Sequence, residues 1–177
     1  MKPVKLIRPN KDYLNSYLEA CRELQLHNEL SDIFFHNPDH FAEWKDSIFT
    51  KFEDLKCGRN LPEGYVPASV FWLVEEDMFI GEGSIRHRLT PSLERFGGHI
   101  SYAIRPSKWR MGYGTLFLGL LLPEARKLGI DKALITCDED NRGSARVMEK
   151  NAGVYQDTVD NHIEGKPRRT KRYWIQL

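Results

Sequence analysis

Apolar residues recur every three or four positions in the first third of the chain, a pattern typical of amphipathic helices. The first of these helices is expected over residues 10–27, with Asn10 as its N-cap. A second is expected from the capping residue Asp39 to about residue 55. A short strand over residues 4–8 precedes both helices. The pattern therefore predicts a helical segment, residues 10–57, ahead of most of the strands.

Short apolar runs bounded by turn residues dominate the rest of the chain, and they predict strands separated by two further helices. Strand 99–104, helix 112–128 and strand 132–137 follow one another, so the two strands should start as parallel neighbours. The chain is thus expected to be one α/β (α+β) domain over residues 1–177. The other expected elements are strands 69–75 and 78–86, which form a hairpin, helix 141–151, and strands 154–159 and 171–175.

Length and charge exclude several classes of protein. With 26 basic and 25 acidic residues in 177, the formal charge is +1, which argues against a protein that coats nucleic acid. The longest uncharged apolar stretch, residues 113–122, is about half of what a bilayer requires, so no membrane span is expected. Charged residues interrupt the apolar runs at the amino end, which predicts a cytoplasmic protein. The three cysteines lack C-x-x-C spacing and are expected to be free thiols, with no metal site.

The clearest chemical signal lies in residues 105–115. This segment combines glycines, the open N–H groups of a helix start, and the cations Lys108 and Arg110, features that together are typical of a phosphate site. Glycines at such a turn can also serve the backbone angles alone. A dinucleotide fingerprint would need a third glycine where Phe117 stands, and the P-loop motif G-x-x-x-x-G-K-[ST] does not occur in the sequence. Both of these nucleotide motifs are therefore disfavoured.

The same loop resembles the acetyl-coenzyme A loop of the GNAT superfamily of N-acetyltransferases, whose signature is [QR]-x-x-G-x-[GA] between a strand and a helix. Trp109 departs from the first signature position, and Arg110 is a candidate to supply the missing charge. The resemblance covers about residues 79–175 and includes the Asn141-x-x-Ser144 start of the late helix. The six signature positions are here Trp109, Arg110, Met111, Gly112, Tyr113 and Gly114.

The resemblance implies a twisted, mixed, mostly antiparallel sheet with a splayed parallel strand pair flanked by helices. It places the acetyl-CoA-binding core at residues 98–151 and the helical segment on the acceptor side, with the pantetheine arm between the splayed strands. A backbone N–H near residues 102–104 would then polarise the thioester carbonyl. Asn141 can also act as a plain N-cap, and both roles are compatible. The residues expected to hold acetyl-CoA are Ile100, Tyr102, Ala103, Ile104, Trp109, Arg110, Met111, Gly112, Tyr113, Gly114, Thr115, Asn141 and Ser144.

An amine nucleophile is mostly protonated at neutral pH, so a base or a chain of water molecules must remove a proton. His99 is the first candidate base, and its alternative is a histidine held by hydrogen bonds on a sheet face. Glu82 is the second, and its alternative is a solvated strand glutamate. Many relatives place a tyrosine acid in the late helix, where this chain has Met148. Water, Cys137 or Tyr102 could protonate the thiolate instead, or it could leave as the anion.

The function implied is direct transfer of acetyl from acetyl-CoA to a primary amine in a ternary complex. The acceptor can be a small molecule, such as a polyamine, an amino sugar or an amino acid, or a peptide N-terminus, and the resemblance leaves a homodimer open. A non-catalytic acyl-CoA sensor on the same fold is the alternative, favoured by the missing tyrosine. The basic cluster over residues 166–172 is expected to be a solvated hairpin tip, so no nucleic acid partner is predicted.

Overall fold

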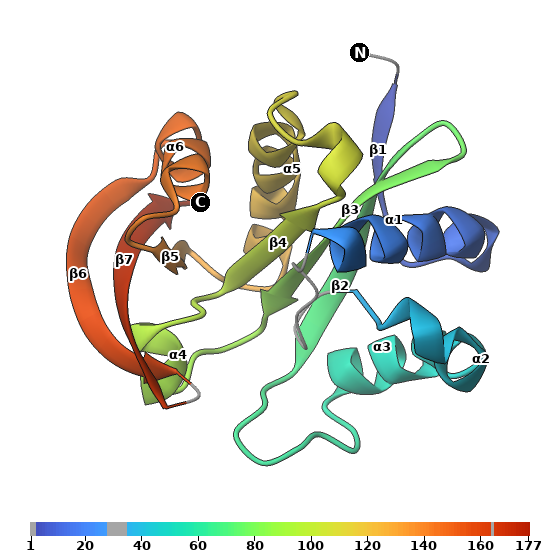
Figure 1. Ribbon diagram of the computed structural model, residues 1–177. Helices are drawn as coiled ribbons and strands as arrows, with labels where there is room; N and C mark the ends of the chain where they lie inside the picture. The colour runs from blue at the N-terminus through green and yellow to red at the C-terminus, as the bar shows by residue number, and fades with distance from the viewer. Residues whose placement is uncertain (1–2, 28–34, 164) are drawn as a thin grey trace.

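Two antiparallel sheets form the frame of the molecule and diverge from one another between β4 and β5 (Figure 1). The structure is a computed structural model and describes residues 3–27, 35–163 and 165–177. In the first sheet the strand order is β1 (Val4–Ile7), β2 (Ala68–Glu75), β3 (Met78–Arg86) and β4 (Ile100–Ile104). In the second it is β5 (Lys132–Asp138), β7 (Lys166–Gln176) and β6 (Val154–Ile163). This division agrees with the mixed α/β fold that the sequence predicts.

Helices cover both faces of the first sheet (Figure 1). One face packs against α1 (Leu14–Leu26), α2 (Phe41–Trp44) and α3 (Ile48–Cys57), which share an aromatic core with β2 and β3. The other face packs against α5 (Tyr113–Lys127), whose apolar side joins the core between the two sheets. The remaining helices are α4 (Pro91–Arg95), α6 (Arg142–Lys150) and the 3-10 turns Lys11–Tyr13, Pro38–His40 and Pro106–Lys108. No helix in the described ranges is both long enough and apolar enough to span a membrane.

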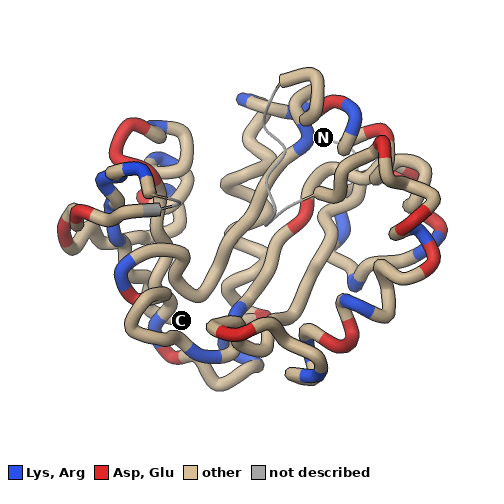
Figure 2. Tube along the Cα trace, turned by 60° about the horizontal axis from the view of Figure 1, so that its bottom comes forward, with Lys and Arg blue, Asp and Glu red and all other residues tan. Residues whose placement is uncertain are grey.

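The two sheets touch where β4 and β5 begin. The backbone N–H of His99 donates to the Leu134 carbonyl at 2.7 Å, and the Leu134 N–H donates to Nδ1 of His99 at 2.9 Å. Gly98 is required beside this contact, because its φ is 60° and a Cβ there would lie 2.4 Å from the Leu134 oxygen. Beyond this point each strand belongs to its own sheet (Figure 2). The predicted splayed pair is therefore hinged at His99 and open toward the carboxyl ends of both strands.

Most predicted elements are confirmed, but one helix and two strands differ from the prediction. The helix predicted over residues 39–55 divides into α2 and α3, and the N-cap is Asn37, whose side chain accepts the Asp39 N–H. The last two strands, β6 and β7, are longer than predicted. Their ladder continues through polar residues to the pair Ile163–Lys166 at the tip of the hairpin. The three cysteines, Cys21, Cys57 and Cys137, are free thiols as predicted.

An ion pair with a buried arginine fixes the end of β4 that leads into the glycine loop to α1. Arg105 is 4% exposed, and its guanidinium donates to the Glu23 carboxylate and, at 3.0 Å, to the Phe79 carbonyl. Glu23 also accepts the backbone N–H of Ser107 at 3.0 Å. Burial by itself would raise the pKa of Glu23, but these hydrogen bonds outweigh burial and hold the pKa below its ordinary value. The start of the glycine loop is therefore clamped to the helical layer.

Replacing Arg105 should destabilise the protein strongly, because it leaves buried acceptors without a partner. For Arg105→Met we expect a loss of about 3 kcal/mol in the free energy of unfolding, measured by urea denaturation. The matched change Arg59→Met, which breaks an ion pair whose arginine is 59% exposed, should cost less than about 1 kcal/mol. Ionised Glu23 contributes to the free energy of unfolding above its ordinary pKa of 4.5. This contribution is lost as the pH falls through the lower pKa that Glu23 has in the folded protein. Equal losses in the two variants would contradict the clamp.

Candidate active site

The turn from β4 into α5 presents an open helix N-terminus. Arg110 and Gly112 have φ angles of 61° and 89°, so the chain reverses sharply just before the helix. No side chain caps α5, and a Cβ at Gly112 would meet no atom within 4 Å. The first N–H groups of an uncapped helix carry partial positive charge and bind anions such as phosphate. The predicted phosphate loop therefore leads into an uncapped helix start, a feature that phosphate sites share.

The side chains of this loop mostly support its shape. Trp109, at the departing signature position, donates from Nε1 to the Ile104 carbonyl at 2.6 Å, and its ring lies 5.3 Å from that of His27. Tyr113 is buried and donates to Glu75 at 2.9 Å. The side chain of Tyr113 therefore faces away from the loop surface, and only its backbone can contact a ligand there. The loop residues with exposed side chains include Arg110 and Met111, and Thr115 lies within the first turn of α5.

Lys108 forms an ion pair with Glu75, the residue that also accepts the hydrogen bond from Tyr113. Its Nζ lies 3.5 Å from Glu75 and 5.6 Å from the centre of the Tyr113 ring. Of the two cations that the sequence places near the phosphates, Lys108 is thus engaged in the protein interior, whereas Arg110 is exposed. Arg110 is the cation that remains available to a bound anion.

The edge of β4 that faces the gap carries backbone groups outside the β3 ladder. The Arg105 N–H donates to Ile80, and the Arg86 N–H donates to His99, so odd-numbered residues of β4 bond to β3. Because antiparallel ladder bonds alternate, the backbone groups of Ile100 and Tyr102 and the N–H of Ile104 point toward the gap instead, whereas the Ile104 carbonyl is bonded to Trp109. Ala103 faces the helical layer and packs against the aromatic core. The strand thus offers donors and acceptors to an extended ligand lying alongside it.

Tyr102, Gly114 and the start of α6 meet on one side of the gap. A Cβ at Gly114 would lie 3.3 Å from Val147 and 3.8 Å from the Tyr102 ring, so the glycine leaves room for a close approach of α6 to α5. Asn141 caps α6 through its side-chain oxygen, which accepts the Ser144 N–H at 2.9 Å. The interpretation of Asn141 as an N-cap is confirmed.

Glu82 is a buried carboxylate within the aromatic core. It is 5% exposed and accepts a hydrogen bond of 2.9 Å from Nε1 of Trp72 and another from the backbone of Phe35. Burial raises the pKa of Glu82 to about 7, against the lowering effect of these two hydrogen bonds. The alternative of a solvated strand glutamate is therefore wrong. A carboxylate with a pKa near neutrality can take up a proton under physiological conditions.

His99 lies at the hinge between the sheets and not beside Glu82. In the register of the first sheet Glu82 pairs with Ala103, so His99 is four residues away, roughly 13 Å along β4. Its Nδ1 is occupied as an acceptor, which puts the ring hydrogen on Nε2. Burial and the nearby Arg86 lower the pKa of His99, against a raising effect of Glu94. Neutral His99 thus completes the hinge, and this geometry favours the histidine held by hydrogen bonds over the base.

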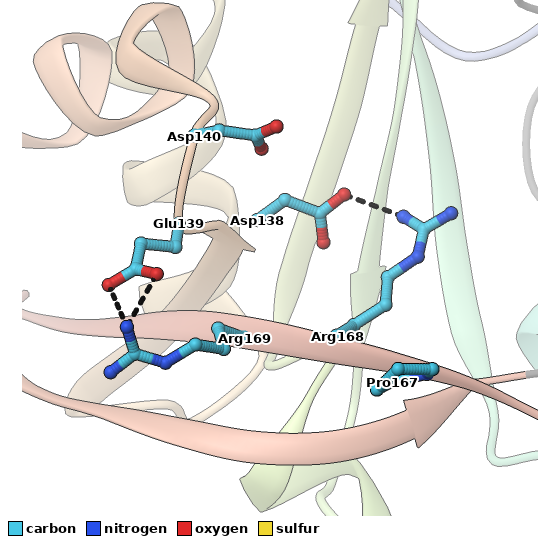
Figure 3. A pocket seen from close by; sticks show the side chains of 6 residues that line it. All are labelled: Asp138, Glu139, Asp140, Pro167, Arg168 and Arg169. Atoms are coloured by element: carbon cyan, nitrogen blue, oxygen red, sulfur yellow. Dashed lines mark hydrogen bonds and ion pairs between the residues drawn. The ribbon is translucent and has the colours of Figure 1, made fainter.

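Acidic side chains at the end of β5 pair with the basic cluster that the sequence singles out. A pocket of about 520 Å³ lies there, and Figure 3 shows Arg168 directed at Asp138 and Arg169 at Glu139. These ion pairs measure 2.6 Å and 2.7 Å. Arg172 binds Asp157 through two bonds of 2.7 Å and 2.6 Å. The partners of two of these three arginines, the last residue of β5 and the residue that follows it, lie outside the hairpin of β6 and β7.

The sequence gives little signal for three residues that shape the site. Arg105 and Glu23 are 82 positions apart, and Trp72 contacts Glu82 across the β2–β3 ladder. In the sequence Arg105 simply follows the predicted strand 99–104, and Trp72 is one apolar residue within the predicted strand 69–75. The hairpin register does place Trp72 opposite Glu82, which is the one signal that could have identified this pair.

Removing the His99 ring should weaken the fold. For His99→Ala we expect a loss of about 1–3 kcal/mol near pH 7.5, because the buried Leu134 N–H is left unpaired. The pKa of His99 is lowered in the folded state, so its contribution is present above about pH 6.5 and is lost as pH falls through the folded value. The difference between wild type and variant, measured by urea denaturation, should therefore shrink toward acidic pH. The exposed His162→Ala is the control, and unchanged stability with lost turnover would instead support His99 as a base.

Comparisons with known proteins agree with this geometry. Residues 19–153, more than half of the chain, match the family model described as an acetyltransferase (GNAT) domain. No curated protein matches the sequence. Similar solved structures include Mycobacterium smegmatis RimJ with a CoA disulfide, at 15% identity and a TM-score of 0.74, covering 99% of this chain and 82% of that one.

Two further solved structures are similar over nearly the whole chain. The Salmonella typhimurium acetyltransferase that modifies the N-terminal serine of ribosomal protein L7/L12 has 15% identity and a TM-score of 0.70, covering 100% of this chain and 96% of that one. The microcin C7 self-immunity acetyltransferase MccE, with acetyl-CoA and AMP, has 13% identity and a TM-score of 0.69, covering 98% and 92%. At these identities the likeness concerns the fold. The family model decides the assignment: the chain belongs to the GNAT acetyltransferases, enzymes that take their acetyl group from acetyl-CoA.

Proposed function

We propose that this acetyltransferase moves the acetyl group to a primary amine by direct attack in a ternary complex. The observation that carries the proposal is the hinge at His99, beyond which β4 turns backbone groups outside the β3 ladder toward the gap beside an uncapped helix. An extended arm along β4 and a diphosphate at the start of α5 would satisfy both sets of groups. The thioester supplies an acyl carbon that an amine can attack.

The residues around the gap suit acetyl-CoA. The side-chain oxygens of Ser101 and Tyr102 are buried and have no hydrogen-bond partner among the described residues. Buried polar groups are rarely left unpaired, and a ligand is one of the few things that can satisfy them. In this proposal the backbone of β4 holds the arm, and the N–H groups from Gly112 to Thr115, with Arg110, hold the phosphates. Asn141 and Ser144 contact the arm from the α6 side.

Glu82 is the base in this proposal. It faces the helical layer of α1 to α3, which lies on the acceptor side, and it is level with Ala103 on the strand that borders the gap. An amine that reaches the thioester from this side would pass its proton to the carboxylate directly or through one water molecule. His99 acts as a positioning residue, because it sets the point from which the two sheets part.

A non-catalytic acyl-CoA sensor remains the second candidate. The observation that favours it is Met148, which is fully buried in the core at the position where many relatives place a tyrosine acid. α6 therefore provides no phenol to the departing thiolate. Turnover distinguishes the sensor from the enzyme, since both bind the coenzyme.

Calorimetry with acetyl-CoA, followed by product analysis over a panel of amines, tests the proposal. The panel contains a polyamine, an amino sugar, amino acids and short peptides with free N-termini. We expect binding and acetylation of at least one class. Binding without any product would support the sensor, and no binding would contradict both functions.

A glycine pair tests where the coenzyme binds. Gly112 and Gly129 lie at opposite ends of α5 with similar φ angles, 89° and 83°, and open space around each. Alanine should strain both equally, by about 1–2 kcal/mol. Only Gly112→Ala should weaken acetyl-CoA binding, by about tenfold, because it distorts the loop. Equal affinities in the two variants would move the phosphate site elsewhere.

The change Glu82→Gln should lower kcat by about 10²- to 10⁴-fold, because glutamine keeps the acceptor for Trp72 but cannot take a proton. In the wild type, activity should fall below about pH 7 as Glu82 becomes protonated. The variant should lack this acidic limb. Exposed Glu63→Gln is the control, and a retained limb with unchanged kcat would remove Glu82 from the mechanism.

A further inference from the structure

The hydroxyl of Tyr102 is a buried polar group that lacks a protein partner. Less than 1 Å² of its oxygen is accessible, and none of the described residues forms a hydrogen bond with it. Leaving such a group unpaired costs folding free energy, so a hydroxyl in this position is usually satisfied by a ligand or a water molecule. Ser144 of α6 lies near this hydroxyl and lowers the Tyr102 pKa, but it does not meet the geometry of a hydrogen bond.

Helices α5 and α6 surround the Tyr102 ring. The ring packs edge-on against Phe117 of α5, with 6.5 Å between the ring centres, and it lies beside Gly114, which Val147 of α6 also approaches. This side of β4 is opposite to the side on which Glu82 lies, since Gly83 pairs with Tyr102 and Glu82 pairs with the next residue, Ala103. An acyl group lying along the edge of β4 would therefore have the carboxylate on one side and the phenol on the other.

The chemistry of the leaving group calls for a donor on this second side. When the thioester breaks, the sulfur departs with the electron pair, and burial penalises that negative charge. The pKa of the neighbouring buried thiol Cys137 shows the penalty, since burial raises it to about 11, partly offset by Lys171. Met148 offers no hydroxyl. Burial also raises the pKa of Tyr102 to about 12, so the phenol keeps its hydrogen and remains a donor at physiological pH.

We propose that the Tyr102 hydroxyl donates a hydrogen bond to the coenzyme A sulfur as the thiolate leaves. This inference rests on the proposed function. The amine nitrogen forms a bond with the acetyl carbon, the carbon–sulfur bond breaks, and the electron pair stays on the sulfur. The amine proton passes to Glu82, and the released thiolate takes a proton from solvent. Tyr102 stays protonated and stabilises the charge that develops on the sulfur.

Titration of bound coenzyme A tests this contact without turnover. The ultraviolet absorbance of the thiolate gives the pKa of the bound thiol in the wild type and in Tyr102→Phe. A hydrogen bond to the thiolate lowers that pKa, so removing the hydroxyl should raise it by about one unit. The control Tyr173→Phe removes another buried phenol, which contacts Glu149, and should leave the thiol pKa unchanged. Tyr102→Phe should also keep or increase stability, because its hydroxyl has no partner among the described residues.

Turnover provides the second measurement. With the best amine, Tyr102→Phe should lower kcat by about 10- to 100-fold and change the affinity for acetyl-CoA by less than about threefold. An unchanged pKa of the bound thiol in Tyr102→Phe would overturn the inference, even if the enzyme is active. The inference would also fail if Ser144→Ala raised the pKa of the thiol while Tyr102→Phe did not. A wild type that binds coenzyme A but acetylates no amine would refute the transfer, while the thiol titration would still decide the contact. Absence of coenzyme binding would overturn both.

Discussion

The hinge between His99 and Leu134 is the contact on which the site depends. An imidazole nitrogen takes the place that a strand carbonyl would occupy, so β4 and β5 join at one end and separate at the other. Gly98 allows the close approach, and Arg86 holds the turn through the carbonyls of Gly97 and Gly98. Because the strands part, β4 keeps backbone donors and acceptors that a continuous sheet would have consumed. The gap is thus a consequence of strand pairing.

Elements from both layers then bring chemical groups to this edge. The helical layer places Glu82 in an aromatic core that shifts its pKa toward neutrality, and the Arg105–Glu23 pair anchors the same layer to the loop. On the other face, α5 and α6 surround the Tyr102 phenol with apolar side chains. The two faces therefore differ in chemistry. In the mechanism that we propose, one face accepts a proton and the other donates a hydrogen bond, as an acyl transfer with opposite demands at nitrogen and sulfur requires.

The sequence predicts the local elements well because their signals are local. The glycine loop, the caps at Asn10 and Asn141 and the β2–β3 hairpin all depend on neighbouring residues. Side-chain partners depend on contacts between distant segments, and a pattern of single residues does not encode these. His99 has the residue type of a base, yet its surroundings place it in the hinge. Glu82 is as compatible with a solvated strand position as with a base, and only its contacts show that burial raises its pKa to about 7.

Hydrogen–deuterium exchange with and without acetyl-CoA tests the central claim most directly. If the coenzyme lies along the free edge of β4 and against the start of α5, the amides of Tyr102, Ile104 and residues 113–115 should become protected on binding. Amides of β1 and β6, on the outer edges of the two sheets, should not change. Protection confined to other segments, with β4 unaffected by saturating coenzyme, would contradict the account.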